Sequence, residues 1–281
     1  MTLIELLVAL VVSGVLVAGV YRTFISQQHT FTVQEQVVDM QQNARLAINR
    51  MTRELRMAGY GRLDATFFVI GKVHGTYQDV VTPNGAGSVT VIGGYQAVTT
   101  LSAFASQGQN FILVNNASSF DMAKRQYICI NGIDSHQIKT IAGNQIELKD
   151  TLNYAHLAGE PIFLITAITY SHGIIGDPFR GVAGDPLLRN DNLGAGPQPV
   201  AENIENLQFL YILKDDVWNG NKWVPDPRLN VPAAQRADIR IIQVNIVART
   251  DRTDPELAKT GDGFRRRNLT SNIQLRNLGF L

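Results

Sequence analysis

The chain begins with an almost charge-free stretch, MTLIELLVALVVSGVLVAGVYRTFI, which covers Met1–Ile25. Glu5 is the only ionisable side chain up to Val20, and Arg22 is the next side chain that carries a charge. A helix needs about 20 apolar residues to cross a bilayer, so this stretch is long enough. A cleaved secretory signal is the alternative, but no Lys or Arg precedes the apolar run and no small-residue cleavage site follows it. We therefore expect residues 1–29 to form a transmembrane helix.

Residues 30–61 are expected to continue the same helix in amphipathic form. Apolar residues recur there in steps of three and four, which predicts one apolar helix face. They are Val33, Val37, Met40, Ala44, Ile48, Met51, Leu55 and Ala58. Arg45, Arg53 and Arg56 lie on the polar flank, and Gly59 and Gly61 provide a stop signal. A helix that is apolar all round and then amphipathic is typical of a membrane-rooted stalk that carries a head.

After Gly61 the apolar period changes towards two, which predicts β-strands. The expected strands are Thr66–His74, Ser88–Ile92, Asn110–Val114, Gln126–Asn131, His136–Ile141, Gln145–Lys149, Pro161–Ser171, Leu207–Leu213, Ile239–Arg249 and Leu269–Arg276. Turn signals separate them, and the Gly-, Pro- and Asp-rich stretch His172–Pro199 is expected to be a long surface loop. The predicted fold is α+β: a long N-terminal helix packed on an antiparallel β-sheet head at 62–281. An additional β module is expected within the head at about 110–171.

The composition excludes several kinds of site. A formal net charge of +1 gives no whole-chain field that would favour nucleic acid or acidic partners. Cys129 is the only cysteine, so the chain has neither an intramolecular disulfide nor a cysteine-rich metal site. The sequence contains no G-x-S-x-G or P-loop motif. The histidines are scattered without metal-ligand spacing; they are His29, His74, His136, His156 and His172.

We accordingly expect no enzyme activity, no catalytic residue, no cofactor and no metal site. One cluster of oxygen-bearing side chains offers possible calcium ligands: Asp215, Asp216, Asn219 and Asn221. Their spacing is not that of an EF-hand loop, and a hairpin turn between Leu213 and Trp223 is the favoured explanation.

A basic segment near the C-terminus is the remaining charged feature. From Arg236 to Leu281 it holds eight Arg and one Lys against four Asp and one Glu, or nine minus five, a net +4. Its densest part is Arg265-Arg266-Arg267. Such a patch can bind nucleic acid by counterion release, but Phe264 is the only aromatic residue among these charges. We favour a solvated loop or an ionic contact with another subunit, and we do not expect nucleic-acid binding.

The opening decapeptide Met1-Thr2-Leu3-Ile4-Glu5-Leu6-Leu7-Val8-Ala9-Leu10 resembles the mature N-terminus of type IV pilins and pseudopilins. In that family a prepilin peptidase/N-methyltransferase removes a leader and methylates the new N-terminal residue. Met1 stands where Phe is commonest. Because Glu stands at position five, we expect the numbering to be that of the processed protein, with Met1 as the methylated N-terminus. The helix end at Gln41–Gly61 also resembles PilW-type minor pilins. So do the segments Ile241–Thr250 and Arg265–Asn277.

Glu5 is the central residue of the expected assembly site. A carboxylate at membrane depth costs on the order of 3 kcal/mol, which marks it as functional. The alternative is that Glu5 sits at the membrane interface, where a negative charge suits the start of a helix. We expect Glu5 to pair with the α-amino group of Met1 on a neighbouring subunit, and the resemblance implies the same role.

Leu3 and Gly14 are the other expected assembly residues. Family members often combine a glycine at position 14 with a proline at position 22, and the helix unwinds between them in some filaments. Here Arg22 replaces the proline. Close helix–helix approach at Gly14 and Gly19 is therefore at least as good an explanation of these glycines as local unwinding.

The resemblance implies a minor pilin that initiates or caps a type IV pilus. Its implied partners are other minor pilins, the major pilin and a tip adhesin. Its implied location is the bacterial inner membrane with a periplasmic head before assembly, and the extracellular pilus afterwards. The alternatives are a minor pseudopilin of a type II secretion system, a major filament subunit and a DNA-uptake pilin.

Overall fold

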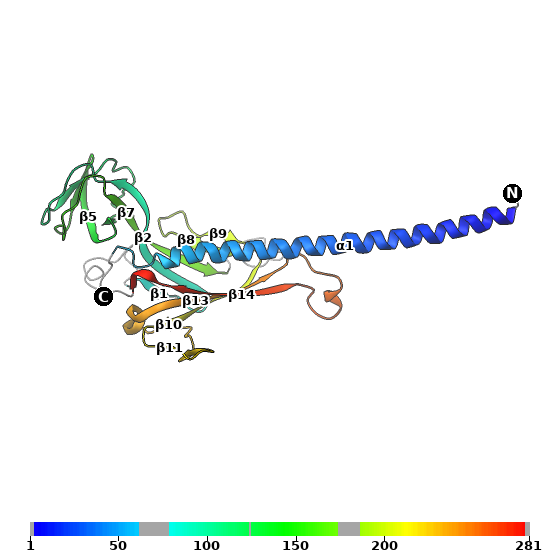
Figure 1. Cartoon of the computed structure of the whole chain (residues 1–281). Helices are drawn as coiled ribbons and strands as arrows, with labels where there is room; N and C mark the ends of the chain where they lie inside the picture. Colours follow the sequence, from blue (N-terminus) through cyan, green and yellow to red (C-terminus); the bar gives the residue numbers. More distant parts are fainter. Residues whose placement is uncertain (1–2, 62–78, 124, 174–185, 279–281) are drawn as a thin grey trace.

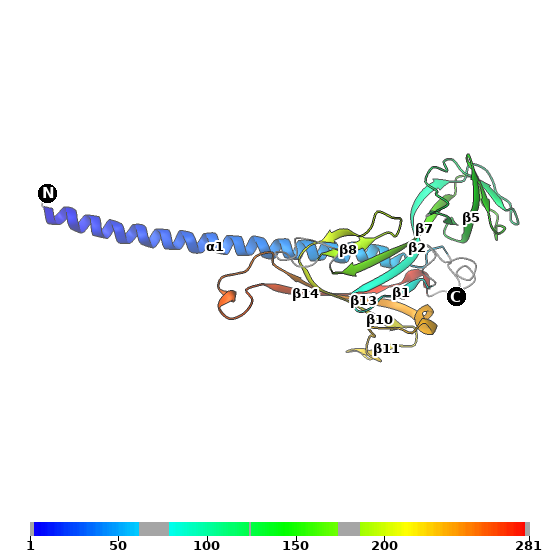
Figure 2. The same ribbon diagram turned by 180° about the vertical axis from the view of Figure 1, so that it is seen from behind.

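One long helix, α1 (Leu3–Arg56), projects from a β-rich head in the computed structural model of the chain (Figure 1). The structure describes residues 3–61, 79–123, 125–173 and 186–278. The N-terminal end of α1 lies far from the head, and both views show the first half of the helix standing clear of every strand (Figures 1 and 2). The absence of proline and of helix-breaking pairs lets this one helix continue from the apolar half into the amphipathic half.

The helix ends earlier than expected. Residues up to Gly61 were predicted to be helical, but Met57–Gly61 forms a turn. The reason is the backbone of Gly59 and Gly61, with φ of 77° and 115°, values at which glycine is favoured. The Gly59 N–H donates to the Ile92 carbonyl at 2.8 Å, so the turn joins a strand of the head. The glycine stop signal itself is confirmed.

The described strands form three antiparallel sheets. The largest has the path β1-β2-β7-β4-β5-β6-β3, with β8 on β7 and β9 on β8. Its strands are β1 (Val81–Pro83), β2 (Ser88–Thr100), β3 (Phe111–Leu113), β4 (Tyr127–Ile130), β5 (Asp134–Ala142), β6 (Gln145–Leu148), β7 (Pro161–His172), β8 (Leu187–Asn190) and β9 (Gln198–Ala201). A second sheet has the order β10-β13-β14, from β10 (Ile204–Leu213), β13 (Ile239–Arg249) and β14 (Arg266–Gln274). A small hairpin pairs β11 (Val217–Trp218) with β12 (Trp223–Val224). The α+β prediction of a long helix with antiparallel sheets is confirmed.

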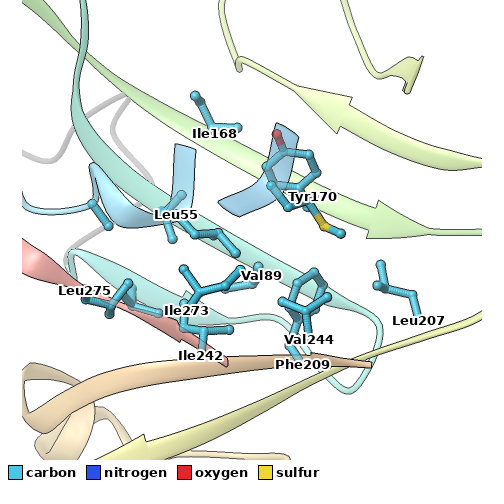
Figure 3. Close-up of a cluster of buried hydrophobic side chains, with 14 of the residues drawn as sticks. Leu55, Val89, Ile168, Tyr170, Leu207, Phe209, Ile242, Val244, Ile273 and Leu275 are labelled. Atoms are coloured by element: carbon cyan, nitrogen blue, oxygen red, sulfur yellow. The ribbon is translucent and has the colours of Figure 1, made fainter. Parts of the chain in front are cut away.

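The second half of α1 packs on the head through its apolar face. Met40, Ala44, Ala47, Met51 and Leu55 are buried, while Val37 and Ile48 pack beside them. Figure 3 shows Leu55 facing side chains from both large sheets, including Val89 and Tyr170 from one and Ile242, Val244 and Ile273 from the other. The stripe of three- and four-residue steps predicted for this half is thus the face that covers the head.

A second apolar core lies in the part of the head furthest from the N-terminus (Figures 1 and 2). It is built from β3, β4, β5, β6 and the loops around them, and it also includes Leu101, before the expected start of the β module at residue 110. The long strands β2 and β7 run through both cores, and their pairing contains bulges at Gly94/Gln96 and Ala97/Thr99. These bulges add local twist and bend where the strands pass from one core to the other.

Several strand boundaries differ from those predicted. The stretch His172–Pro199, expected to be a loop, contributes β8 and the start of β9, because Leu187 and Leu188 are buried against β7. Strand β14 begins three residues before the expected Leu269 and ends at Gln274, since it follows the full length of β13. The expected strand Thr66–His74 lies outside the described residues.

Candidate assembly interface

The first half of α1 is an exposed apolar surface. The exposed fraction is 81% for Leu3, 67% for Val15 and 59% for Phe24, and no residue before Met40 in the described helix is buried. Among the described residues, α1 is the one helix that is long and apolar enough to cross a membrane. A large exposed apolar surface marks a membrane or protein contact. This half of the helix is therefore compatible with membrane anchoring.

Glu5 lies exposed in the first turns of this surface, beside Ile4 and Leu6. Leu3, the other expected assembly residue of the first turn, is exposed as well. Met1 lies outside the described residues, so the expected pairing of Glu5 with a neighbouring Met1 stays a prediction. Position five lies within the first turn of α1, where a carboxylate also interacts favourably with the helix dipole.

Gly14 and Gly19 lie in uninterrupted α-helix. A Cβ atom added at either position would meet nothing within 4 Å, so neither glycine is required by a contact inside this chain. Each glycine instead leaves a shallow spot on the exposed helix, and such a spot suits close approach of another helix.

A carboxylate on the helix fastens the second half of α1 to the head. The Tyr170 hydroxyl donates to Glu54 at 2.6 Å, and the Arg189 Nε donates to the same carboxylate at 2.9 Å. Burial, together with the charge of Glu54, raises the pKa of Tyr170 well above its usual range, so the hydroxyl remains a donor. These contacts fix the rotation of the helix about its axis and its axial position relative to β7 and β8.

A second contact joins the head to the helix nearer the N-terminus. The loop between β13 and β14 extends along α1 towards the N-terminus (Figures 1 and 2). There the Asp254 carboxylate lies 3.7 Å from His29 Nε2 and accepts a 2.6 Å hydrogen bond from Arg265. The Arg265 guanidinium lowers the pKa of Asp254. His29 lies eleven positions before Met40, the first buried helix residue, so the loop lengthens the contact between head and helix by about 16 Å at ~1.5 Å per residue.

The basic triplet Arg265–Arg267 is largely neutralised within the chain. Arg265 pairs with Asp254, and Arg266 pairs with both Glu205 and Asp262. We had favoured a solvated loop or a contact with another subunit for this triplet. All three arginines are exposed, which fits a solvated segment. Two of them nevertheless have acidic partners within the chain, which are Asp254 and Asp262 in the loop and Glu205 in β10.

The inserted module contains a buried ionic network that the sequence analysis missed. His136 and His156, predicted to be scattered, both approach Asp134, with Nε2 to carboxylate distances of 3.0 and 3.2 Å. His136 Nδ1 also lies 3.1 Å from Asp150, and His156 Nδ1 lies 2.8 Å from Glu160. Both imidazoles are buried. The only available signal was that Asp134 lies two positions before His136, the first residue of a predicted strand; the loop that returns His156 had none.

The charges in this network stabilise one another. Burial alone lowers the pKa of His136, but the carboxylates of Asp134 and Asp150 outweigh it and raise the pKa to about 9. Burial likewise raises the pKa of Asp134, but His136, Asn153 and His156 outweigh it and lower the pKa to about 2. No group of three or more His, Cys, Asp or Glu side chains is arranged to hold a metal ion in the described part of the chain. The network is a buried charge cluster of the module.

The proposed calcium ligands form part of a hairpin. Asp216 pairs with Arg228 at 2.6 Å and accepts from the Leu213 N–H. The Asn219 side chain accepts from the N–H groups of Asn221 and Lys222, which closes the turn between β11 and β12. The turn explanation is confirmed by these bonds. Cys129, which lies in the expected strand Gln126–Asn131, is fully buried in β4.

No family model, no curated protein and no solved structure matches the chain.

Proposed function

We propose that the protein is a subunit of a type IV pilus-like filament, and specifically a minor pilin that helps to initiate or cap the filament with other minor pilins. The observation that carries this proposal is the division of α1. Its second half is fastened to the head, while its first half exposes an apolar surface in which Glu5 is the only side chain that carries a charge before Arg22.

This division supports assembly by helix packing. An apolar helix with one carboxylate can rest in a bilayer and later exchange lipid for the apolar surfaces of other helices. The carboxylate would be costly at either place unless it met a positive charge. The α-amino group of Met1 on a neighbouring subunit is the proposed partner. The pairing would neutralise both charges and set the axial position of the incoming helix.

The proposed minor role rests on the resemblance of the helix end and of the C-terminal segments to PilW-type minor pilins. The proposed setting is the inner membrane before assembly and the extracellular pilus afterwards, and the proposed partners are other minor pilins, the major pilin and a tip adhesin. The proposed role of the head is contact with other subunits; in support of it, the buried side chains of Asp134, His136 and His156 are enclosed in the module and pair with one another.

The test replaces Glu5 with alanine in the full chain expressed in its host. The variant should insert into the membrane at the wild-type level but should be depleted several-fold from sheared filaments, as measured by immunoblot. Ser13→Ala, which alters another exposed polar residue of the same helix half, is the matched control and should enter filaments normally. Normal incorporation of Glu5→Ala would contradict the pairing, and absence of the wild-type chain from filaments would contradict the function.

A further inference from the structure

The second half of α1 has an outward face that the head leaves uncovered. With a rotation of about 100° per residue, most of the exposed residues of this half gather on the side opposite Met40, Met51 and Leu55. We call them the outward stripe: Phe31, Glu35, Val38, Asp39, Gln42, Arg45, Leu46, Asn49, Arg53 and Arg56. Phe31 is 70% exposed and Leu46 is 57% exposed. The stripe continues from the exposed apolar half of the helix towards the C-terminal end of α1.

The charges along the outward stripe are segregated. Both acidic residues, Glu35 and Asp39, lie on its lower part, which is the part nearer the N-terminus and the anchor. The three arginines lie above them, towards the C-terminal end of the helix; they are Arg45, Arg53 and Arg56. None of these five side chains makes an ion pair within the described residues, although other arginines of the head, such as Arg189, Arg228 and Arg265, are paired. The stripe therefore carries an unneutralised pattern, negative below and positive above.

This pattern discriminates between the ways in which two copies could pack stripe to stripe. Two parallel copies at the same height would place arginine against arginine and carboxylate against carboxylate, which is unfavourable. Antiparallel copies would place opposite charges together, but two helices anchored from the same membrane side cannot run in opposite directions. Parallel copies shifted along the axis bring Glu35 and Asp39 of the upper copy level with the arginines of the lower copy.

The shift follows from the residue positions. Glu35 and Arg45 are ten positions apart, and Asp39 and Arg56 are seventeen, so the shift is about 15 to 26 Å at ~1.5 Å per residue. A shift of fifteen positions lies inside this range and places Phe31 of the upper copy level with Leu46 of the lower copy. The same axial shift therefore allows both the apolar contact between Phe31 and Leu46 and the ionic contacts between the acidic residues and the arginines.

We propose that the outward stripe is a register device: it binds the outward stripe of a second copy of this chain raised by about 15 to 26 Å, and it repels a copy at the same height. Two anchors resting in one bilayer have the same height, so the stripe opposes their association there. Raising one copy out of the membrane turns repulsion into attraction. The contact joins the N-terminal part of one stripe to the C-terminal part of the other, so it is a heterologous contact between two copies. This inference rests on the proposed filament function.

Cysteine cross-linking of the full chain tests the shift without changing any charge. Phe31→Cys is placed in one tagged copy and Leu46→Cys in another, and a short bis-maleimide is added to sheared filaments and, separately, to host membranes. Cys129 is fully buried, so it does not compete. The 31–46 adduct should form in filaments several-fold more than the same-position adducts 31–31 and 46–46. A predominance of same-position adducts, or equal yields of all three, would overturn the inference.

Charge reversal tests the cause of the shift. One copy carries Glu35→Arg and Asp39→Arg, and the other carries Arg45→Glu and Arg53→Glu. Each reversed copy should lose the 31–46 adduct several-fold with itself, because its lower and upper charges then have the same sign. The two reversed copies together should regain it. An adduct yield that is insensitive to reversal, or a loss that mixing does not restore, would refute the electrostatic register.

The outcomes separate the inference from the proposed function. If the chain is present in sheared filaments at the wild-type level but gives no 31–46 adduct, the register device fails and the filament function stands. If the chain never enters filaments, the filament function fails first.

Discussion

The Tyr170 hydroxyl donates a 2.6 Å hydrogen bond to Glu54, and so joins strand β7 to the last turns of the long helix. Arg189 on the neighbouring strand β8 shares the same carboxylate at 2.9 Å. A single helix residue thus holds two strands of one sheet. Because Tyr170 is fully buried and Arg189 is about one-fifth exposed, loss of Glu54 would leave two donors without their acceptor.

Glu54→Ala should destabilise the folded head by about 3 kcal/mol, since it leaves a buried donor and a partly buried charge unpaired. Tyr170→Phe should cost less, about 2 kcal/mol, because it removes one bond to a charged group and leaves the Glu54–Arg189 pair. The free energy of unfolding is measured by urea titration of the detergent-solubilised chain. Glu35→Gln, a charge change at an exposed position of the same helix, should leave it unchanged. Equal stability of all three variants would contradict this assignment.

Gly93→Ala should also loosen the junction between helix and head. A Cβ atom at this position would lie 2.6 Å from the Met57 carbonyl oxygen, which is backbone and cannot move aside alone. We expect a loss of about 1 to 3 kcal/mol from overpacking, with faster hydrogen exchange in the turn after α1. Gly261→Ala, whose added Cβ would have its nearest contact at 3.8 Å, is the control. Unchanged hydrogen exchange in the turn would show that β2 moves away from the added methyl group without loss of stability.

The stability of the module should depend on pH through its buried histidine. The pKa of His136 is raised to about 9, above its usual 6.5, so its stabilising contribution is complete below pH 6.5 and is lost as the pH rises through 9. The pKa of Asp134 is lowered to about 2, so its contribution is complete above pH 4 and is lost as the pH falls towards 2.

Hydrogen exchange measured by mass spectrometry, after correction for the intrinsic rate, should show the module opening more easily at pH 9.5 than at pH 6, by on the order of 2 kcal/mol. Peptides from β13 and β14, which belong to the other core, serve as the internal control. His136→Asn should remove most of the pH dependence between 6 and 9.5 and lower the protection at pH 6. A pH response of the same size in β13 and β14 would place its origin outside this network.

Removal of residues 1–28 should leave a soluble, folded head. The head-facing side of α1 starts at His29, where Asp254 approaches, and its buried residues start at Met40, so the truncation removes exposed apolar surface and keeps the helix face that completes the core. Circular dichroism and size-exclusion chromatography measure the outcome. A further deletion to residue 45, which removes Met40 and Ala44, should expose the core and reduce stability. Aggregation of the shorter truncation itself would mean that the first helix half supports the head.

The helix and its two halves could be predicted because each rests on local patterns. The charge-free run gives the exposed half, the steps from Val33 to Ala58 give the head-facing half, and Gly59 and Gly61 give the end. Most strands likewise follow from alternation, and β13 was predicted with its observed bounds. Strand β8 was missed because Leu187 and Leu188 stand in a stretch rich in Gly, Pro and Asp, and their pairing with β7 depends on residues distant in sequence.

The ionic contacts could not be predicted for a related reason. Glu54 and Tyr170 are separated by 116 positions, and Asp134 and His156 by 22, and neither pair belongs to a motif with fixed spacing. Their meeting depends on how β7 crosses the helix and on how the loop before β7 returns to β5. Glu5, by contrast, is conspicuous in the sequence because it breaks an apolar run, although its expected partner lies on another molecule.

The continuity of β2 and β7 through both cores has a mechanical consequence. The module lies beyond the helix end, at the far side of the head from the anchor (Figure 2), and these two strands join it to the rest. Tension applied between module and anchor would be carried along the backbones of β2 and β7 in parallel, so that two strands share the force and their mutual pairing is not pulled apart. The load would then pass from β7 through Tyr170 to Glu54 and into the helix axis. Under such a pull, the bulges beside Gly94 and Ala97, where the ladder is interrupted, would be the first points to yield.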